Sequence, residues 1–285
     1  MSSDPADSTR HHWRVEDIAL SGIDRAAIEH NEDLFFMLLS ASFVETGSDT
    51  YANNLAEHYG DHLEISAWLK RHWETEELQH GYALRAYVEA VWPLFPWQQA
   101  YDGFFAEYSQ LCTMEELYPD ARLELVARCV VETGTTAYYQ TLGGLTEEPV
   151  LKALLGHIRN DEVSHFKHFL QYFKQLQQTQ PVGRLQIARI LYQRLKEMRE
   201  SDSDVALRHV WAHRQGVGGA YGGAFFAQPS AQFEVMAQRI YRLVSSRLPA
   251  DMAVRMLLKP LLLPHKVEGL LHAPIAKFAT RVMSA

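Results

Sequence analysis

Apolar residues recur every three or four positions along most of this chain of 285 residues, and strictly alternating stretches are scarce. A recurrence of three and four is the period of an α-helix with one buried face, whereas alternation marks a half-buried strand. The first long pattern repeats its apolar residues in this way, at Leu34, Met37, Leu38, Ala41 and Val44. The chain is therefore predicted to be all-α.

Glycine and proline divide this pattern into separate helices. Gly60-Asp61 separates the first two, Pro93 ends the second, and Gly143-Gly144 ends the helix that begins near Asp120. Helices are expected over 23–56, 62–91, 96–119, 120–142, 147–178, 182–200, 203–215, 230–247 and 250–258, with a proline-interrupted tail after them. The glycine-rich run 216–223 lacks the spacing and the preceding strand of a phosphate-binding loop, so a hinge or a close helix contact is expected there.

The length is sufficient for one large domain or two small ones with a sizeable core. The polar start predicts a poorly ordered arm over residues 1–15. The helical patterns that follow predict a bundle over 16–180 and a helical extension over 181–285 that packs on the bundle.

Charge is divided unevenly between the two parts of the chain. Residues 181–285 contain 15 Lys and Arg against 7 Asp and Glu, a net charge of +8. The whole chain has 27 against 35, so residues 1–180 contain 12 against 28, a net charge of −16. Two interpretations are equally consistent with this: a basic C-terminal face for an anionic partner, or a basic part that packs on the acidic part.

The cysteine content and the apolar runs indicate the cellular location. Cys112 and Cys129 are the only cysteines and provide no disulfide framework, which favours a reducing compartment. Residues 1–10 do not resemble a signal peptide, and no segment approaches the ~20 uninterrupted apolar residues of a membrane helix. We expect a cytoplasmic protein without a membrane span and without a nucleic-acid partner.

The spacing E-x-x-H occurs at Glu77–His80 and again at Glu162–His165. Residues three apart on an α-helix lie on one face, so each copy directs a carboxylate and an imidazole the same way. About one such match is expected by chance in a chain of this size. A single copy is therefore more consistent with a solvated helix face than with a site.

A second repeat, V-E-T-G at residues 44–47 and 131–134, completes the pattern. It places one Glu 32 residues before the first E-x-x-H and another 30 residues before the second. Two helical hairpins related by a pseudo-twofold axis would bring four helices together. Di-metal carboxylate bundles use a Glu from each of two helices and an E-x-x-H from each of the other two. The predicted metal ligands are Glu45, Glu77, His80, Glu132, Glu162 and His165.

The donor set indicates the kind of metal. Four carboxylates and two imidazoles are hard to borderline ligands, which suit iron or manganese better than a metal that prefers thiolates. Four ionised carboxylates in a helix core would also repel one another and lose hydration, whereas two divalent cations would compensate them. The expected cofactor is two iron ions or a manganese and iron pair.

Glu76 and Asp161 directly precede the two motif glutamates. Metal-bound imidazoles usually donate their second N–H to a carboxylate, so Asp161 is expected to orient His80, and Glu76 to orient His165. The alternative is that both are surface acids.

Thr135 and Thr136 follow Glu132 by three and four positions. One of the two hydroxyls is expected to face the metals and to help deliver protons during catalysis. The alternative is that each hydroxyl bonds to its own helix backbone.

The residues of these motifs resemble those of one protein family. Residues 73–81, Trp-Glu-Thr-Glu-Glu-Leu-Gln-His-Gly, are similar to the W-x-x-E-E-x-x-H-G segment of soluble acyl-[acyl-carrier-protein] desaturases. Residues 161–165 resemble their D-E-x-x-H, and Glu132 with Thr135 resembles their E-x-x-T. The likeness covers about residues 30–180.

The resemblance implies a ferritin-like four-helix bundle with a di-metal core, in a homodimer. It also implies a di-iron centre that uses O2 as co-substrate and takes electrons from an external donor, a ferredoxin-like protein or another reductase. The expected substrate is a fatty-acyl or other apolar chain, free or bound to an acidic acyl carrier protein.

The chain differs from the family in its length, in the residues of its second motif and in its tail. Its sequence is therefore as consistent with another oxidation of an acyl or small-molecule substrate as with desaturation. One alternative is a ferritin-like iron-binding or storage protein, or a manganese/iron oxidase, without an organic substrate. The ~100 helical residues beyond a bundle argue against a cage-forming storage protein. A second alternative is a metal-free helical interaction protein.

Overall fold

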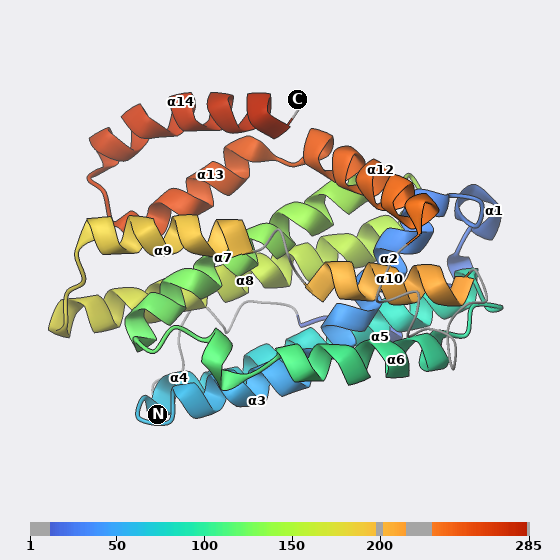
Figure 1. Ribbon diagram of the computed structural model, residues 1–285, viewed down its shortest axis with the longest axis horizontal. Coiled ribbons are helices and arrows are strands. Elements are labelled where there is room, and N and C mark those ends of the chain that lie inside the picture. Colours follow the sequence, from blue (N-terminus) through green and yellow to red (C-terminus); the bar gives the residue numbers. More distant parts are fainter. Residues whose placement is uncertain (1–11, 198–201, 215–229, 284–285) are drawn as a thin grey trace.

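The computed structural model describes residues 12–197, 202–214 and 230–283 (Figure 1). Every regular element in these ranges is helical, and no strand occurs among them. The prediction of an all-α chain is confirmed. The glycine-rich run 216–223 lies outside the described residues.

Four long helices form the centre of the molecule: α2 (Glu32–Thr46), α5 (Glu74–Val91), α7 (Ala121–Gly143) and α8 (Pro149–Thr179). Helices α7 and α8 pack along each other as a hairpin, which can be followed from green to yellow in Figure 1. Helix α2 packs along α5, and α5 also contacts α8. The chain therefore contributes two helix pairs to one bundle.

Three of these helices begin at a side chain that accepts backbone N–H groups. Asn31 accepts from Leu34 at the start of α2, and Asp120 accepts from the first turn of α7. Glu148 does the same for α8, with Pro149 at the first helical position, where its missing N–H removes no bond. Glu148 also accepts the Tyr87 hydroxyl at 2.9 Å, which ties the start of α8 to α5.

The helix expected over 23–56 is divided into three: α1 (Arg25–Ile28), α2 and α3 (Ser48–His58). Gly47 joins α2 to α3, with φ −86° and ψ 4°. A Cβ at this position would lie 3.4 Å from the ring of Tyr108 and 3.5 Å from that of Phe104, so the bend lies tightly against α6 (Trp97–Leu111). The apolar period continues across the bend, and for this reason the sequence pattern did not reveal it.

The helix expected over 62–91 is continuous but contains a π-helical turn, η4 (Leu69–Trp73), between α4 (Leu63–Trp68) and α5. A π-helical turn accommodates more residues than an α-helical one, so it rotates the following helix face. Trp68 and Trp73, five positions apart, both contact the ring of Phe169 on α8 as a result. This turn thus determines which face of α5 points into the bundle.

The remaining helices surround the central four: α6 (Trp97–Leu111), α9 (Arg184–Glu197), α10 (Asp202–Arg214), α12 (Ala231–Arg247), α13 (Ala250–Leu258) and α14 (His265–Met283). Helix α10 packs on α2 and α6, whereas α9, α12 and α13 pack on α7. The tail expected after residue 258 is interrupted around Pro260 and Pro264, but the residues that follow form one helix, α14. Pro264 precedes this helix, and Pro274 lies within it on its exposed side.

The buried apolar side chains form two large clusters at different levels of the bundle. On α8, Ile158 belongs to one cluster and Phe166 to the other. On α7, Tyr139 belongs to the same cluster as Ile158, and Val130 belongs to the same cluster as Phe166. Most of the buried residues between these levels are polar, so a polar layer crosses the bundle between two apolar ones.

Candidate metal centre

The six residues predicted as ligands form this polar layer, and all six are buried. Their ligand atoms fall into two groups, and within each group the atoms lie within 4.8 Å of one another. The first group is Glu45, Glu77, His80 and Glu162, and the second is Glu77, Glu132, Glu162 and His165. Glu77 and Glu162 belong to both groups. The arrangement offers two neighbouring cation positions, each with its own Glu and His and with two carboxylates in common.

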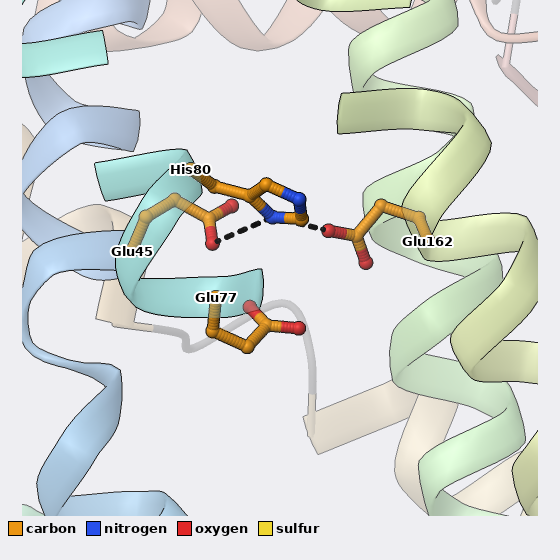
Figure 2. Close-up of side chains that lie close together, drawn as sticks. All are labelled: Glu45, Glu77, His80 and Glu162. Carbon is orange, nitrogen blue, oxygen red and sulfur yellow. Dashed lines mark ion pairs between the residues drawn. The ribbon is translucent and has the colours of Figure 1, made fainter. Parts of the chain in front are cut away.

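Figure 2 shows the first group, in which His80 on α5 lies between carboxylates from two other helices. His80 Nδ1 lies 3.2 Å from Glu162 Oε1 on α8 and 3.8 Å from Glu45 Oε2 on α2. The three side chains therefore converge on one point from different sides.

The second group repeats this geometry around His165 on α8. Its Nδ1 atom lies 3.0 Å from Glu77 Oε1 and 3.6 Å from Glu132 Oε2. Both imidazoles thus direct Nδ1 into the polar layer, which is the orientation that a metal-binding imidazole needs.

The far sides of the two imidazoles meet the carboxylates expected from the sequence. His80 Nε2 lies 3.0 Å from Asp161 Oδ2, and His165 Nε2 lies 2.8 Å from Glu76 Oε2. The contacts cross between α5 and α8, since each helix supplies the acid that holds the imidazole of the other. A hydrogen bond on Nε2 fixes the tautomer that leaves Nδ1 free to act as a ligand.

Trp13 closes one side of the site, and no sequence signal indicated it. The indole is 5 % exposed, and its N–H donates to Asp161 Oδ2 at 2.8 Å. Its ring also stacks on His80, with the centroids 6.1 Å apart. The adjacent His12 lies 3.3 Å from Glu76. The expectation of a polar, poorly ordered arm therefore does not hold for residues 12–15, because this indole buries its apolar ring and finds a partner for its N–H.

The two threonines on α7 have different surroundings. Thr135 Oγ1 donates to Glu162 Oε2 at 2.7 Å, so this hydroxyl contacts a predicted ligand. Thr136 is fully buried, and its Oγ1 has no hydrogen-bond partner among the described residues. Thr136 is therefore the hydroxyl with unused bonding capacity next to the polar layer.

Tyr139 is a further site residue, and the sequence motifs did not indicate that it contacts a ligand. Its hydroxyl donates to Glu45 Oε1, across the bundle from α7 to α2. Tyr139 follows Glu132 by seven positions, which is two helical turns on the same face. The spacing therefore indicates that the Tyr139 side chain lies on the same helix face as Glu132, but it does not identify Glu45 as its partner.

Gly81, directly after His80, lets α5 approach α2. A Cβ on Gly81 would lie 2.5 Å from the Thr46 backbone nitrogen and 2.7 Å from its Cα. Because Thr46 follows Glu45, this close approach brings Glu45 and His80 together. The glycine that ends the first motif thus has a steric role.

Burial and mutual repulsion raise the pKa values of two of the carboxylates. Burial raises the pKa of Glu77 well above its usual range, and the charges of Glu162 and Glu45 raise it further. Burial likewise raises the pKa of Glu132 to about 7, although its hydrogen bond with His165 opposes this. Protons therefore compensate part of the negative charge when no cation is bound.

The pKa values of the two imidazoles and of Glu162 are shifted so that these three groups are charged. Burial by itself lowers the pKa of both His80 and His165, but the surrounding carboxylates outweigh it and raise both pKa values well above the ordinary range. Burial acts to raise the pKa of Glu162, but the two imidazoles outweigh it and hold that pKa below its usual range. The layer therefore holds protons that bound cations would displace.

The ligand atoms that converge without well-formed hydrogen bonds fit a pair of cations. Four buried atoms on the predicted ligands, His80 Nδ1, His165 Nδ1, Glu132 Oε2 and Glu162 Oε1, face other ligand atoms at ion-pair distance but form no hydrogen bond of good geometry with the described residues. An unsatisfied buried polar atom is costly, and these four all belong to the two convergent groups. Oxygen and imidazole donors suit iron and manganese.

A search against models of known protein families finds no match, and neither does a search of curated proteins. Among the described residues, no helix combines the length and the apolar character needed to span a membrane. The function is therefore argued from the geometry of the polar layer.

Proposed function

We propose that this chain is a ferritin-like di-metal protein that binds two iron ions, or a manganese and an iron ion, between α2, α5, α7 and α8. The observation that carries the proposal is the pair of four-residue groups that share Glu77 and Glu162. A solvated helix face, the ordinary interpretation of E-x-x-H, does not account for six buried side chains in one layer. In a metal-free interaction protein, only protons and the two imidazoles would compensate the buried carboxylates of this layer, at a cost in desolvation that an apolar core would avoid.

In this proposal Glu45 and His80 complete one cation position, and Glu132 and His165 complete the other. When bound and reduced, the metal pair supplies the activation of O2. Asp161 and Glu76 hold the imidazoles in their tautomers, and Trp13 excludes water from the His80 side.

The hydroxyls around the layer have separate tasks. Thr135 and Tyr139 hold Glu162 and Glu45 in place by donating hydrogen bonds to them. Thr136, which is buried and has an uncommitted hydroxyl, is the group placed to hold a proton at Oγ1.

The proposed reaction is the O2-dependent oxidation of a fatty-acyl or other apolar chain. Its support is the resemblance of residues 73–81 and 161–165 to the acyl-carrier-protein desaturases. Desaturation removes two hydrogen atoms from the chain while O2 becomes two water molecules, which requires two further electrons and two protons. A ferredoxin-like donor or another reductase would supply the electrons, and the assembly proposed by the same resemblance is a homodimer.

Anaerobic titration of the metal-free protein with Fe(II), followed by elemental analysis, tests the metal site. The expected result is about two iron ions per chain, and about one or fewer for Glu132→Ala. Glu147→Ala is the matched control, because the Glu147 side chain is 91 % exposed near the start of α8. Less than about one iron per chain, or equal binding by the two variants, would overturn the proposal.

Oxygen consumption tests the reaction separately from metal binding. The reduced, iron-loaded protein is mixed with O2 alone, with a free fatty acid, and with a fatty-acyl carrier protein. Faster consumption with either acyl substrate, together with an oxidised acyl product, supports the proposed reaction. Consumption that is indifferent to both substrates and accumulates ferric iron would replace it with iron storage.

A further inference from the structure

Helix α14 packs with its apolar side outward. Val267, Leu270, Leu271 and Ile275 form what we call the outer face, and all are exposed, Leu270 at 75 %. Among the described side chains of α14, only that of Ala276 is buried. An amphipathic helix ordinarily buries its apolar stripe, so the outer face is without a partner in the described chain. Figure 1 shows α14 at the periphery of the molecule, over α13.

Polar contacts hold α14 in this orientation. Glu268 accepts from Lys259 Nζ at 2.6 Å, and His272 Nε2 lies 3.0 Å from the Asp251 carbonyl oxygen. Both contacts join the inner side of α14 to α13 and the turn after it. Rotating the outer face inward would break them and bury charged groups.

The turn before α14 also defines its direction. Leu262 adopts a left-handed conformation with φ 48° and ψ 48°, which is uncommon for a residue other than glycine. Arg184 on α9 donates to the carbonyl oxygens of Leu261 and Leu262 at 3.1 and 3.0 Å. These bonds anchor the turn to α9, so the outward orientation of α14 is built into the fold.

Two lysines flank the outer face on one side. Lys266 and Lys277 are eleven positions apart, about three turns, so they project in nearly the same direction. Both are exposed, and neither forms an ion pair with the part of the chain that the structure describes. The nearby carboxylates are neutralised, since Glu268 pairs with Lys259 and Asp251 pairs with Arg255. The surface around the outer face is therefore apolar and basic.

We propose that the outer face of α14 docks on an anionic lipid surface, with its apolar residues among the acyl chains and the two lysines at the phosphates. An exposed apolar stripe bordered by lysine is the pattern of helices that lie in the plane of a membrane surface. Among the described residues, no helix is long and apolar enough to span a membrane, so the proposal concerns docking at the surface. This docking does not depend on the metal site, and its test does not use it.

A second copy of the chain is a less suitable occupant of this face. A twofold pairing of α14 with itself about the middle of the outer face, near Leu271, would be antiparallel and would bring Lys266 of one copy close to Lys277 of the other. Like charges brought together at an interface oppose association. Phosphate groups would instead neutralise both lysines.

Sedimentation of the full chain with vesicles tests the proposal. Binding is expected to mixed phosphatidylglycerol–phosphatidylcholine vesicles and to be much weaker to phosphatidylcholine alone. Leu270→Asp is expected to lower the binding roughly tenfold or more, because it places a charge in the apolar stripe. Leu63→Asp is the matched control, since Leu63 is 77 % exposed on α4, outside the outer face, and its substitution should leave binding unchanged.

The charge requirement is tested by the double variant Lys266→Glu/Lys277→Glu, which should lose the preference for anionic vesicles. Thermal melting of each variant establishes that the fold is kept. Absence of vesicle binding, or an equal loss in both leucine variants, would overturn the proposal. A dimer or a complex with acyl carrier protein that Leu270→Asp abolishes, without vesicle binding, would assign the outer face to a protein instead. Vesicle binding by the iron-free Glu132→Ala variant separates this result from the proposed function.

Discussion

Replacing Gly81 by alanine tests how closely α2 and α5 must approach to bring Glu45 and His80 together. The added Cβ would lie 2.5 Å from the Thr46 nitrogen and 2.6 Å from its Oγ1, whereas ordinary contacts begin near 3.4 Å. The two helices must therefore separate by about 1 Å at this point. Thr46 cannot yield by a rotamer change alone, because two of the three closest atoms belong to its backbone.

The magnitude follows from two opposing effects. Overpacking of a tight contact costs about 1–3 kcal/mol, whereas alanine in place of glycine within a helix stabilises by about 1 kcal/mol. Gly156, two turns inside α8 from its start, isolates the second effect, because a Cβ there would meet nothing within 4 Å. Gly81→Ala should thus melt about 2–12 °C below Gly156→Ala.

Calorimetry of the two metal-free variants measures this difference, and Fe(II) titration measures its consequence for the site. Gly81→Ala should weaken the cation position of Glu45 and His80 by about tenfold, because a ligand shell tolerates only ~0.5 Å of displacement. Gly156→Ala should bind iron as the unmodified chain does. Equal melting temperatures together with equal iron binding would refute the reasoning, since the close approach would then constrain neither stability nor the site.

Three further predictions concern the surroundings of the layer. Trp13→Phe keeps the apolar ring but removes the N–H bonded to Asp161, and chemical denaturation should show a loss of about 1–2 kcal/mol; an unchanged free energy of unfolding would show that this bond is not needed. Thr135→Val removes the bond to Glu162 with little change of shape and should cost about 1.5 kcal/mol in the metal-free protein, whereas Thr135→Ser, measured beside it, should cost less. The pKa of Glu132 is raised from 4.5 to about 7, so the folded state binds the extra proton in this window, and the stability of the metal-free protein should fall as the pH rises from about 4.5 to about 7. Melting temperatures across this range should show a smaller slope for Glu132→Gln, and a slope equal to that of the unmodified chain would contradict the assignment.

Much of the fold could be predicted because it depends on local patterns. The apolar period of three and four indicated the helices, and glycine and proline indicated most of their ends. The bend at Gly47 and the π-helical turn at Leu69–Trp73 escaped, because the apolar pattern continues through both. The helix after Pro264 escaped because Pro274 suggested a further interruption, whereas α14 continues through it.

The sequence likewise predicted some residues of the candidate site and not others. The repeat of V-E-T-G and E-x-x-H predicted the six residues that the structure brings together, and the positions of Glu76 and Asp161 predicted their crossed contacts with the imidazoles. Thr135 and Thr136 could not be told apart by spacing, because the contact of Thr135 with Glu162 depends on where another helix lies, whereas its other contacts are with the backbone of its own helix. Nothing in the sequence near Trp13 indicated a contact with Asp161, 148 residues away.

The sequence by itself determined the all-α class and the residue types that converge in the polar layer, because three- and four-residue spacing on a helix is a local property. Only the tertiary structure decided which groups close that layer and which surface is left without a partner. The Trp13 indole over His80, the approach of α2 at Gly81 and the outward apolar face of α14 all depend on how distant segments are placed. Such placement follows from the packing of the whole chain, which no local pattern records.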